Sequence, residues 1–197
     1  MDRLPALITA MAAALAACDA GSGTPGEPSS RVDSVKGKAR RVSAAELCDV
    51  RHADDRAPRF ALPALAGPSP ATSARWRWVN VWATWCKPCL EELPRLERWA
   101  ARHAGEVDLV LVSADASDAE VARFRAAHPA VPDSVRLADP DALPAWLTTL
   151  GLDAASPIPI HVLVDREGRT RCVRAGGVGD DDLVAAEALL GAPTTAK

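Results

Sequence analysis

A Cys-x-x-Cys pair at the end of an apolar run constrains this chain more than any other feature. Residues 79–82 are almost continuously apolar, Cys86 and Cys89 follow shortly after, and a helical pattern begins at once. Such a run is typical of a strand buried on both faces, so both thiols are predicted to lie at a strand-to-helix junction. Backbone N–H groups and the helix dipole there favour thiolate over thiol. Because thiolate is the attacking species in disulfide exchange, the pattern indicates a redox centre.

Half of a structural zinc site is the alternative interpretation of this pair. Structural zinc needs four ligands at paired spacings, and the sequence contains neither a second Cys-x-x-Cys nor a His-x-x-x-His. We therefore expect no metal, and we also expect no cofactor. The net charge is −3 and no basic cluster is present, so we expect no nucleic-acid partner.

Residues 1–17 have the features of a bacterial export signal. Arg3 is followed by an Ala-rich apolar stretch that is too short to span a bilayer as a stable helix. The Leu-Ala-Ala-Cys that ends at Cys18 resembles the lipobox of lipoproteins, in which the cysteine becomes the lipid-modified N-terminus. Ordinary cleavage near Ala17 is the alternative. Asp19 resembles an inner-membrane retention signal, so we expect an extracytoplasmic chain anchored by lipid, with the periplasmic face of the inner membrane favoured.

Composition divides the remaining chain into a tether, one domain and a tail. Residues 18–41 are rich in Gly, Ser, Pro and charge, and they have too few large apolar side chains to order themselves. Residues 42–192 have the size of one domain, and residues 193–197 form a short tail.

Strand and helix patterns alternate along this domain. Within it, residues 60–65 suggest a short irregular strand or hairpin. Ser117 or Asp118 is the expected cap of one helix and Asp141 the cap of the next. A turn signal between the last two strands adds an antiparallel hairpin, so the expected fold class is α/β with a central mixed sheet flanked by helices. Besides the strand at 79–82, strands are predicted at residues 107–113, 134–138, 160–164 and 170–174, and helices at residues 87–103, 118–128, 141–150 and 180–190.

The chain has five cysteines, of which four remain if Cys18 carries lipid. An even number suits an oxidising compartment. Cys86 with Cys89 is the local pair, and Cys48 with Cys172 would then tie the N-terminal segment to a late strand. Two separate buried thiols are the alternative, because spacing alone does not establish connectivity.

Three motifs together resemble one protein family. They are Trp-Ala-Thr-Trp-Cys-Lys-Pro-Cys at residues 82–89, Leu-Glu-Glu-Leu-Pro at 90–94, and Ser-Pro-Ile-Pro at 156–159 before an apolar strand. In this order they resemble the thioredoxin fold and, more narrowly, the membrane-anchored TlpA/ResA-type thiol–disulfide oxidoreductases. The resemblance covers roughly residues 57–190 and is far more specific than a single Cys-x-x-Cys.

The resemblance implies roles for the residues around the thiols. Cys86 would be the nucleophile, and Cys89 the more buried resolving thiol. Pro159 would be a cis-proline that brings the backbone of Ile158 against the disulfide, where it pairs with a substrate chain. An ordinary trans proline is the alternative. Trp85 would cover the thiols and contact the partner.

Lys87, Glu92 and Asn80 are the residues expected to set the acid–base environment of the thiols. Lys87 lies beside Pro88 between the thiols, where its charge would favour thiolate, although a solvated lysine would be screened. In the resembled family a glutamate at the position of Glu92 influences the titration of the thiols. Asn80 stands where ordinary thioredoxin carries a buried acid, so we expect Glu92 to take any proton-relay role. His161 departs from the family pattern, and a histidine on a strand is more often structural.

The predicted function is a thiol–disulfide oxidoreductase, with two alternatives. The favoured direction is reduction of protein disulfides, with electrons from a membrane reductant and, by resemblance, an apocytochrome c as one possible partner. A peroxiredoxin-type peroxidase would need Thr-x-x-Cys, but Thr84 lies only two residues before Cys86. A lipid-anchored binding or scaffold protein, with Cys86–Cys89 as a structural disulfide, is the second alternative.

Overall fold

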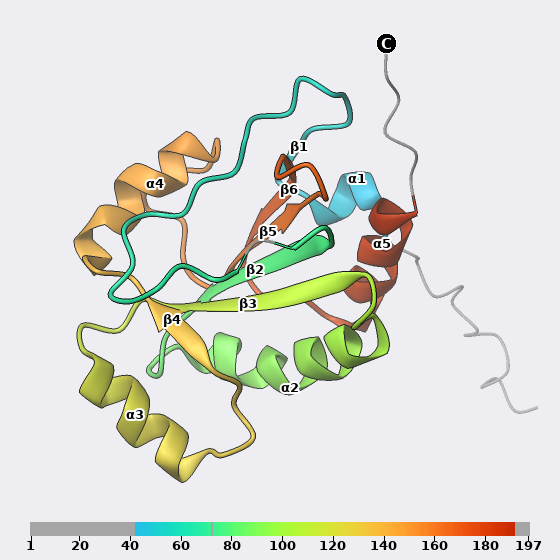
Figure 1. Cartoon of the computed structure of the whole chain (residues 1–197). Helices are drawn as coiled ribbons and strands as arrows, with labels where there is room; N and C mark the ends of the chain where they lie inside the picture. Colours follow the sequence, from blue (N-terminus) through green and yellow to red (C-terminus); the bar gives the residue numbers. More distant parts are fainter. Residues whose placement is uncertain (1–41, 72, 192–197) are drawn as a thin grey trace, which may run out of the picture. The chain divides into compact units, whose positions relative to one another are not determined.

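The computed structural model describes residues 42–71 and 73–191, which form a mixed sheet flanked by helices (Figure 1). The expected signal at 1–17, the lipidation site Cys18, the rest of the tether to residue 41 and the tail at 193–197 lie outside the described residues. Within the described part of the chain, no helix combines the length and the apolar character needed to cross a membrane.

Six strands pair in the order β1-β6-β5-β2-β3-β4. Strand β3 is parallel to both of its neighbours, whereas β5 and β6 form an antiparallel hairpin and β5 is antiparallel to β2. This confirms the predicted α/β class with a mixed sheet, and it puts β2, the strand before the thiols, inside the sheet. The strands are β1 (Val50–Arg51), β2 (Trp76–Trp82), β3 (Val107–Ser113), β4 (Ser134–Arg136), β5 (Ile160–Val164) and β6 (Thr170–Ala175).

Helices cover both faces of this sheet (Figure 1). One face packs against α2, α5 and α1 through a cluster that includes Trp78, Trp99 and Leu183, and the other face packs against α4 through Val81, Val162 and Trp146. Burial on both faces explains why β2 is apolar along nearly its whole length. The helices are α1 (Ala44–Leu47), α2 (Lys87–Arg102), α3 (Asp118–Ala127), the 3-10 helix η1 (Pro140–Ala142), α4 (Leu143–Thr149) and α5 (Asp180–Leu190).

One of the helix caps predicted from the sequence is confirmed and another is wrong. Ser117 caps α3 in a reciprocal capping box with Glu120, as one of the two expected caps. The expectation that Asp141 caps the next helix is wrong. Asp139 accepts the Asp141 N–H at 3.0 Å and caps η1, so α4 begins only at Leu143. The first residues of the predicted helix belong instead to the short 3-10 helix η1, and sequence periodicity does not distinguish a 3-10 turn from the start of an α-helix.

The N-terminal part of the domain differs most from its prediction. The segment at 60–65 forms no strand or hairpin. A single bridge joins Arg59, just before it, to Arg169, and another joins Leu65, its last residue, to Leu137. The unpredicted α1 and β1 precede it, and β1 extends the sheet by pairing with β6. Cys48, between α1 and β1, forms a disulfide with Cys172 of β6.

Candidate active site

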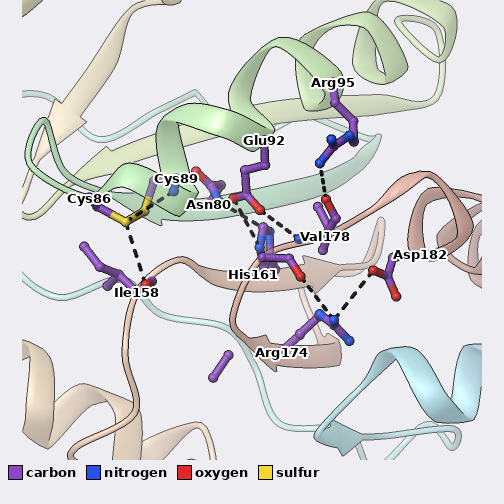
Figure 2. Close-up of polar contacts among 12 residues, drawn as sticks. Asn80, Cys86, Cys89, Glu92, Arg95, Ile158, His161, Arg174, Val178 and Asp182 are labelled. Atoms are coloured by element: carbon purple, nitrogen blue, oxygen red, sulfur yellow. Dashed lines mark hydrogen bonds and ion pairs between the residues drawn. A yellow bond between two sulfur atoms is a disulfide. The ribbon is translucent and has the colours of Figure 1, made fainter. Parts of the chain in front are cut away.

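Cys86 and Cys89 form a disulfide at the N-terminus of α2 (Figure 2). Cys86 is the N-cap residue, and its sulfur accepts the Cys89 backbone N–H at 3.3 Å. Cys86 is 4% exposed and Cys89 is fully buried, so Cys86 is the sulfur nearer to solvent. In the reduced form, the same N–H and the helix dipole would stabilise a thiolate at Cys86.

The loop before β5 lies beside Cys86, at the end of the sheet where β2 ends and β5 begins. Strands β2 and β5 are antiparallel with Val81 opposite Ile160, so the end of β2 lies beside the start of β5. The Ile158–Pro159 bond is cis, and the Ile158 carbonyl oxygen lies 3.7 Å from Cys86 Sγ. A disulfide sulfur carries no proton, so this is a contact here, whereas a reduced thiol could donate to the same oxygen.

A groove of about 610 Å³ opens beside Cys86. Its lining includes Trp85 and Pro88 on the side of the thiols and Ile158 in the opposing loop, with Leu143 and Leu147 of α4 across from them. Most of this lining is apolar, which is the character of a surface that holds a peptide or another apolar group.

Two side chains of the Cys-x-x-Cys region extend into solvent. Trp85 is 70% exposed, and with Val184 it is one of the large exposed apolar side chains among the described residues. Lys87 is also exposed and lies 3.7 Å from Glu91, so its charge is shared with a solvated carboxylate. The structure thus places Trp85 where a partner can contact it, and it places Lys87 where solvent screens its charge.

Glu92 is 1% exposed and lies one helical turn from Cys89, on the side of α2 that faces the sheet (Figure 2). Its Oε1 accepts from Asn80 Nδ2 at 2.9 Å, and its Oε2 accepts from the Val178 backbone N–H at 2.8 Å. His161 Nε2 lies 3.3 Å from Oε1. Cys89 and Glu92 are three residues apart on one helix and therefore share a face.

Asp115 is a site residue that the sequence analysis did not single out. Its buried carboxylate accepts the Thr84 N–H at 3.1 Å, the Thr84 hydroxyl at 2.7 Å and the Ser113 hydroxyl at 2.7 Å. The carboxylate therefore fixes the backbone two residues before Cys86. One signal pointed to it: Asp115 follows β3, and parallel neighbours such as β2 and β3 end at the same sheet edge.

The second disulfide belongs to another part of the domain. Cys48 and Cys172 pack in the cluster of α1, α2 and α5, whereas Cys86 and Cys89 pack with Trp82 and other residues near the start of α2. Residues 42–71 and 73–191 contain no group of three His, Cys, Asp or Glu side chains placed to hold a metal ion. The groups gathered at the site are thus the Cys86–Cys89 disulfide and the buried carboxylates of Glu92 and Asp115, and the Cys48–Cys172 disulfide lies in a different cluster.

Comparison with known proteins agrees with this geometry. The Redoxin family model matches residues 52–190. The chain belongs to the Redoxin family. Its match to the thioredoxin-like protein YneN of Bacillus subtilis is 39% identical over 75 residues, covering 35% of this chain and 44% of YneN. Its match to the thiol-disulfide oxidoreductase ResA of Bacillus thuringiensis is 27% identical over 93 residues, covering 47% and 50%.

This Redoxin chain spans about half the length of these curated relatives. Among solved structures, it is similar to a protein from Chlorobium tepidum described as a thiol:disulfide interchange protein DsbE, with 26% identity and a TM-score of 0.53. That match covers 72% of this chain and 100% of the other. Together with the sheet order, this likeness confirms the thioredoxin-like fold predicted from the motifs.

Proposed function

We propose that this chain is an extracytoplasmic thiol–disulfide oxidoreductase that reduces disulfides in other proteins. One observation carries the proposal: Cys86 caps α2, is joined to Cys89, and lines the apolar groove opposite Ile158. Membership of the Redoxin family and likeness to proteins named as thiol-disulfide oxidoreductases support it.

The reaction begins from the reduced pair. The Cys86 thiolate attacks one sulfur of a partner disulfide, and the other partner sulfur leaves as a thiolate that takes a proton from water. Cys89 then loses its proton and attacks the Cys86 sulfur. This breaks the mixed disulfide, releases the second partner thiolate and leaves the Cys86–Cys89 bond. Two electrons pass from the chain to the partner.

Glu92 is the proposed acceptor of the Cys89 proton. It is buried, shares a helix face with Cys89, and is held by N–H donors from Asn80 and Val178. A carboxylate fixed in this way can take up a proton without first being stripped of bulk water. Asn80 hydrogen-bonds Glu92 and does not itself titrate, which leaves the carboxylate as the acid–base group.

The proposed partner presents an extended segment to the groove. Apolar side chains beside its cysteine would lie against Trp85, Pro88 and the loop with Ile158 and Pro159, while Lys87 remains solvated. A segment in this position can pair its backbone with that loop in the manner of an added strand. An apocytochrome c with oxidised haem-attachment thiols is a partner of this kind.

The electrons must be resupplied after each turnover. We propose a membrane dithiol reductant, because an oxidising compartment offers no soluble pool for this purpose. Lipid attachment at Cys18 to the periplasmic face of the inner membrane would hold the domain near such a reductant.

Two measurements test the lipid anchor. Processing of the signal should be blocked by globomycin, an inhibitor of the lipoprotein signal peptidase, and mass spectrometry should find lipid on the mature N-terminus. An unmodified N-terminus after Ala17 contradicts the anchor.

Trapping tests the oxidoreductase proposal directly. Cys89→Ser removes the resolving thiol, so mixed disulfides on Cys86 should accumulate in cells and be released by dithiothreitol. Cys86→Ser in the same background is the matched control, and it should hold no partner. A Cys89→Ser chain that carries no mixed disulfide, in cells where it is folded and exported, counts against the proposal and favours a structural role for the Cys86–Cys89 bond.

A further inference from the structure

Trp78 and His161 lie next to Glu92 but take no part in the steps above. His161 is buried on β5, and its ring packs edge to face on Trp78 of β2 at a centroid distance of 5.8 Å. The Trp78 indole Nε1 lies 3.1 Å from His161 Nδ1. On the other side of the ring, His161 Nε2 lies 3.3 Å from Glu92 Oε1. Figure 2 shows the side chains of Glu92 and His161 next to each other.

The hydrogen bonds around His161 define which ring nitrogen carries the proton. An indole N–H can only donate, so His161 Nδ1 accepts from Trp78 and carries no proton. Asn80 Nδ2 approaches the same Nδ1 at 3.3 Å and also offers only N–H groups. The ring is therefore neutral, with its single proton on Nε2, the nitrogen that faces Glu92.

The charged residues near this pair are engaged elsewhere. Arg95, one turn along α2, donates to the Val178 carbonyl and pairs with Asp180. Arg174, opposite His161 on β6, pairs with Asp182 and donates to backbone carbonyls. Among the residues that the structure describes, no Lys or Arg lies within ion-pair distance of Glu92. The Glu92 carboxylate therefore depends on neutral N–H donors.

One of these donors is not fully used in the oxidised state. His161 Nε2 is buried at 3.3 Å from Glu92 Oε1, yet it lacks the direction of a full hydrogen bond to any acceptor. A small turn of the carboxylate would complete that bond. The contact can consequently strengthen or weaken as Glu92 gains or loses a proton.

We propose that His161 is a positioning residue of the redox site. Fixed by Trp78 with its proton on Nε2, it orients Glu92 Oε1 and so sets the pH range in which Glu92 exchanges a proton with Cys89. This inference rests on the acid–base role proposed above for Glu92. Strand β5 would then contribute, through His161, to the proton exchange between Glu92 and Cys89. His161 is also a position at which this chain departs from the pattern of the family it resembles.

Two amide substitutions test the contributions of His161 Nδ1 and Nε2 separately. In His161→Gln the terminal amide reaches the place of Nε2 and keeps a donor toward Glu92. In His161→Asn the shorter amide reaches only the place of Nδ1, so it keeps a partner for Trp78 and loses the donor to Glu92. Both replacements are polar and smaller than the ring, so a purely structural role predicts similar behaviour for the two variants.

The measurement is the pH dependence of Cys86 alkylation in the reduced, full-length chain, followed by mass spectrometry. We expect the inflection that depends on Glu92 to move to higher pH by about one unit in His161→Asn, a tenfold change in the protonation equilibrium. The reason for this direction is that a carboxylate with one donor fewer favours its protonated form. His161→Gln should stay close to wild type. In a Glu92→Gln background, both His161 variants should give the profile of Glu92→Gln alone.

Equal shifts in the Asn and Gln variants overturn the proposal, and so does a shift that persists in the Glu92→Gln background. If His161→Asn does not fold, as judged by near-ultraviolet circular dichroism, Trp78→Phe replaces it. That variant removes the indole N–H that holds the His161 ring and leaves Asn80 Nδ2, at 3.3 Å, as the remaining donor to Nδ1, so an unchanged profile is evidence against the positioning role. Partner trapping by Cys89→Ser is independent of this readout, so failure of the proposed function is recognised separately.

Discussion

At the scale of single residues, the buried Asp115 carboxylate stabilises the loop that leads to Cys86. Asparagine in its place would keep one acceptor oxygen but would put an NH2 group against the donors of Thr84 or Ser113. A buried donor left without an acceptor costs about 1–3 kcal/mol. We therefore expect Asp115→Asn to lower the free energy of unfolding by about that amount, as measured by urea denaturation at pH 7.

Asp118→Asn is a suitable control for this variant. Asp118 is an exposed carboxylate nearby in the chain, and the hydrogen bond from Arg136 lowers its pKa, so it is ionised at pH 7. Because water solvates it, the substitution should change stability much less than Asp115→Asn does. Equal losses in both variants would show that burial of Asp115 has no special effect.

Residue identities at the site were predictable where a local spacing carries the chemistry. The Cys86–Cys89 pair follows from its spacing before a helix, whereas the roles expected for Glu92 and Pro159 came from the resemblance of their motifs to those of a known family. Asp115 and the Trp78–His161 contact depend on which strand edges meet. Those contacts join residues 31 and 83 positions apart, and no local pattern encodes them.

At the scale of elements, the Cys48–Cys172 disulfide joins the segment between α1 and β1 to strand β6. It closes a loop with a sequence separation of 124. A cross-link over a long loop restricts the unfolded chain, and removing a native disulfide typically costs about 2–5 kcal/mol. We expect Cys48→Ala with Cys172→Ala to lose stability in this range in denaturant unfolding.

The matched control removes the other disulfide. Cys86→Ala with Cys89→Ala opens a loop with a sequence separation of only 3, so its effect on the unfolded chain is small. A loss in this control as large as that from the Cys48–Cys172 pair would contradict the loop-length account of the long-range disulfide.

The long elements were predictable and so was the short strand β4, whereas α1 and β1 were not. Strand β3 and helix α5 agree with their predicted bounds. Strand β3 is a nearly continuous apolar run, and α5 has acidic residues in its first turn and ends before Gly191. Helix α1 has four residues and β1 has two, which is too short for any periodicity. Their place is determined by pairing with β6 and packing against α5, both of which involve sequence far from them.

At the scale of the whole molecule, the two disulfides should respond differently to reductants. Cys86 lines an open groove, whereas Cys172 is fully buried and Cys48 nearly so. We expect Cys86–Cys89 to open at potentials of about −270 to −200 mV and Cys48–Cys172 only below about −300 mV. Differential alkylation of the folded chain in dithiol redox buffers, with peptide mass spectrometry, measures both potentials.

Two outcomes of that titration would count against the proposed function or the disulfide assignment. A Cys86–Cys89 potential below about −300 mV favours a structural bond over a redox centre. Alkylation of both Cys48 and Cys172 in the unreduced folded chain contradicts their pairing.

The nested order of the two disulfides has a consequence for biogenesis. If the chain is exported from its N-terminus, Cys48 emerges first of the four disulfide-bonded cysteines, then Cys86 and Cys89, and Cys172 last, yet Cys48 pairs with Cys172. An oxidant acting during translocation meets Cys48 and Cys86 together long before Cys172 is available. In such a chain, Cys48 would either stay reduced until Cys172 emerges or first pair with Cys86 or Cys89 and then be rearranged by thiol–disulfide exchange.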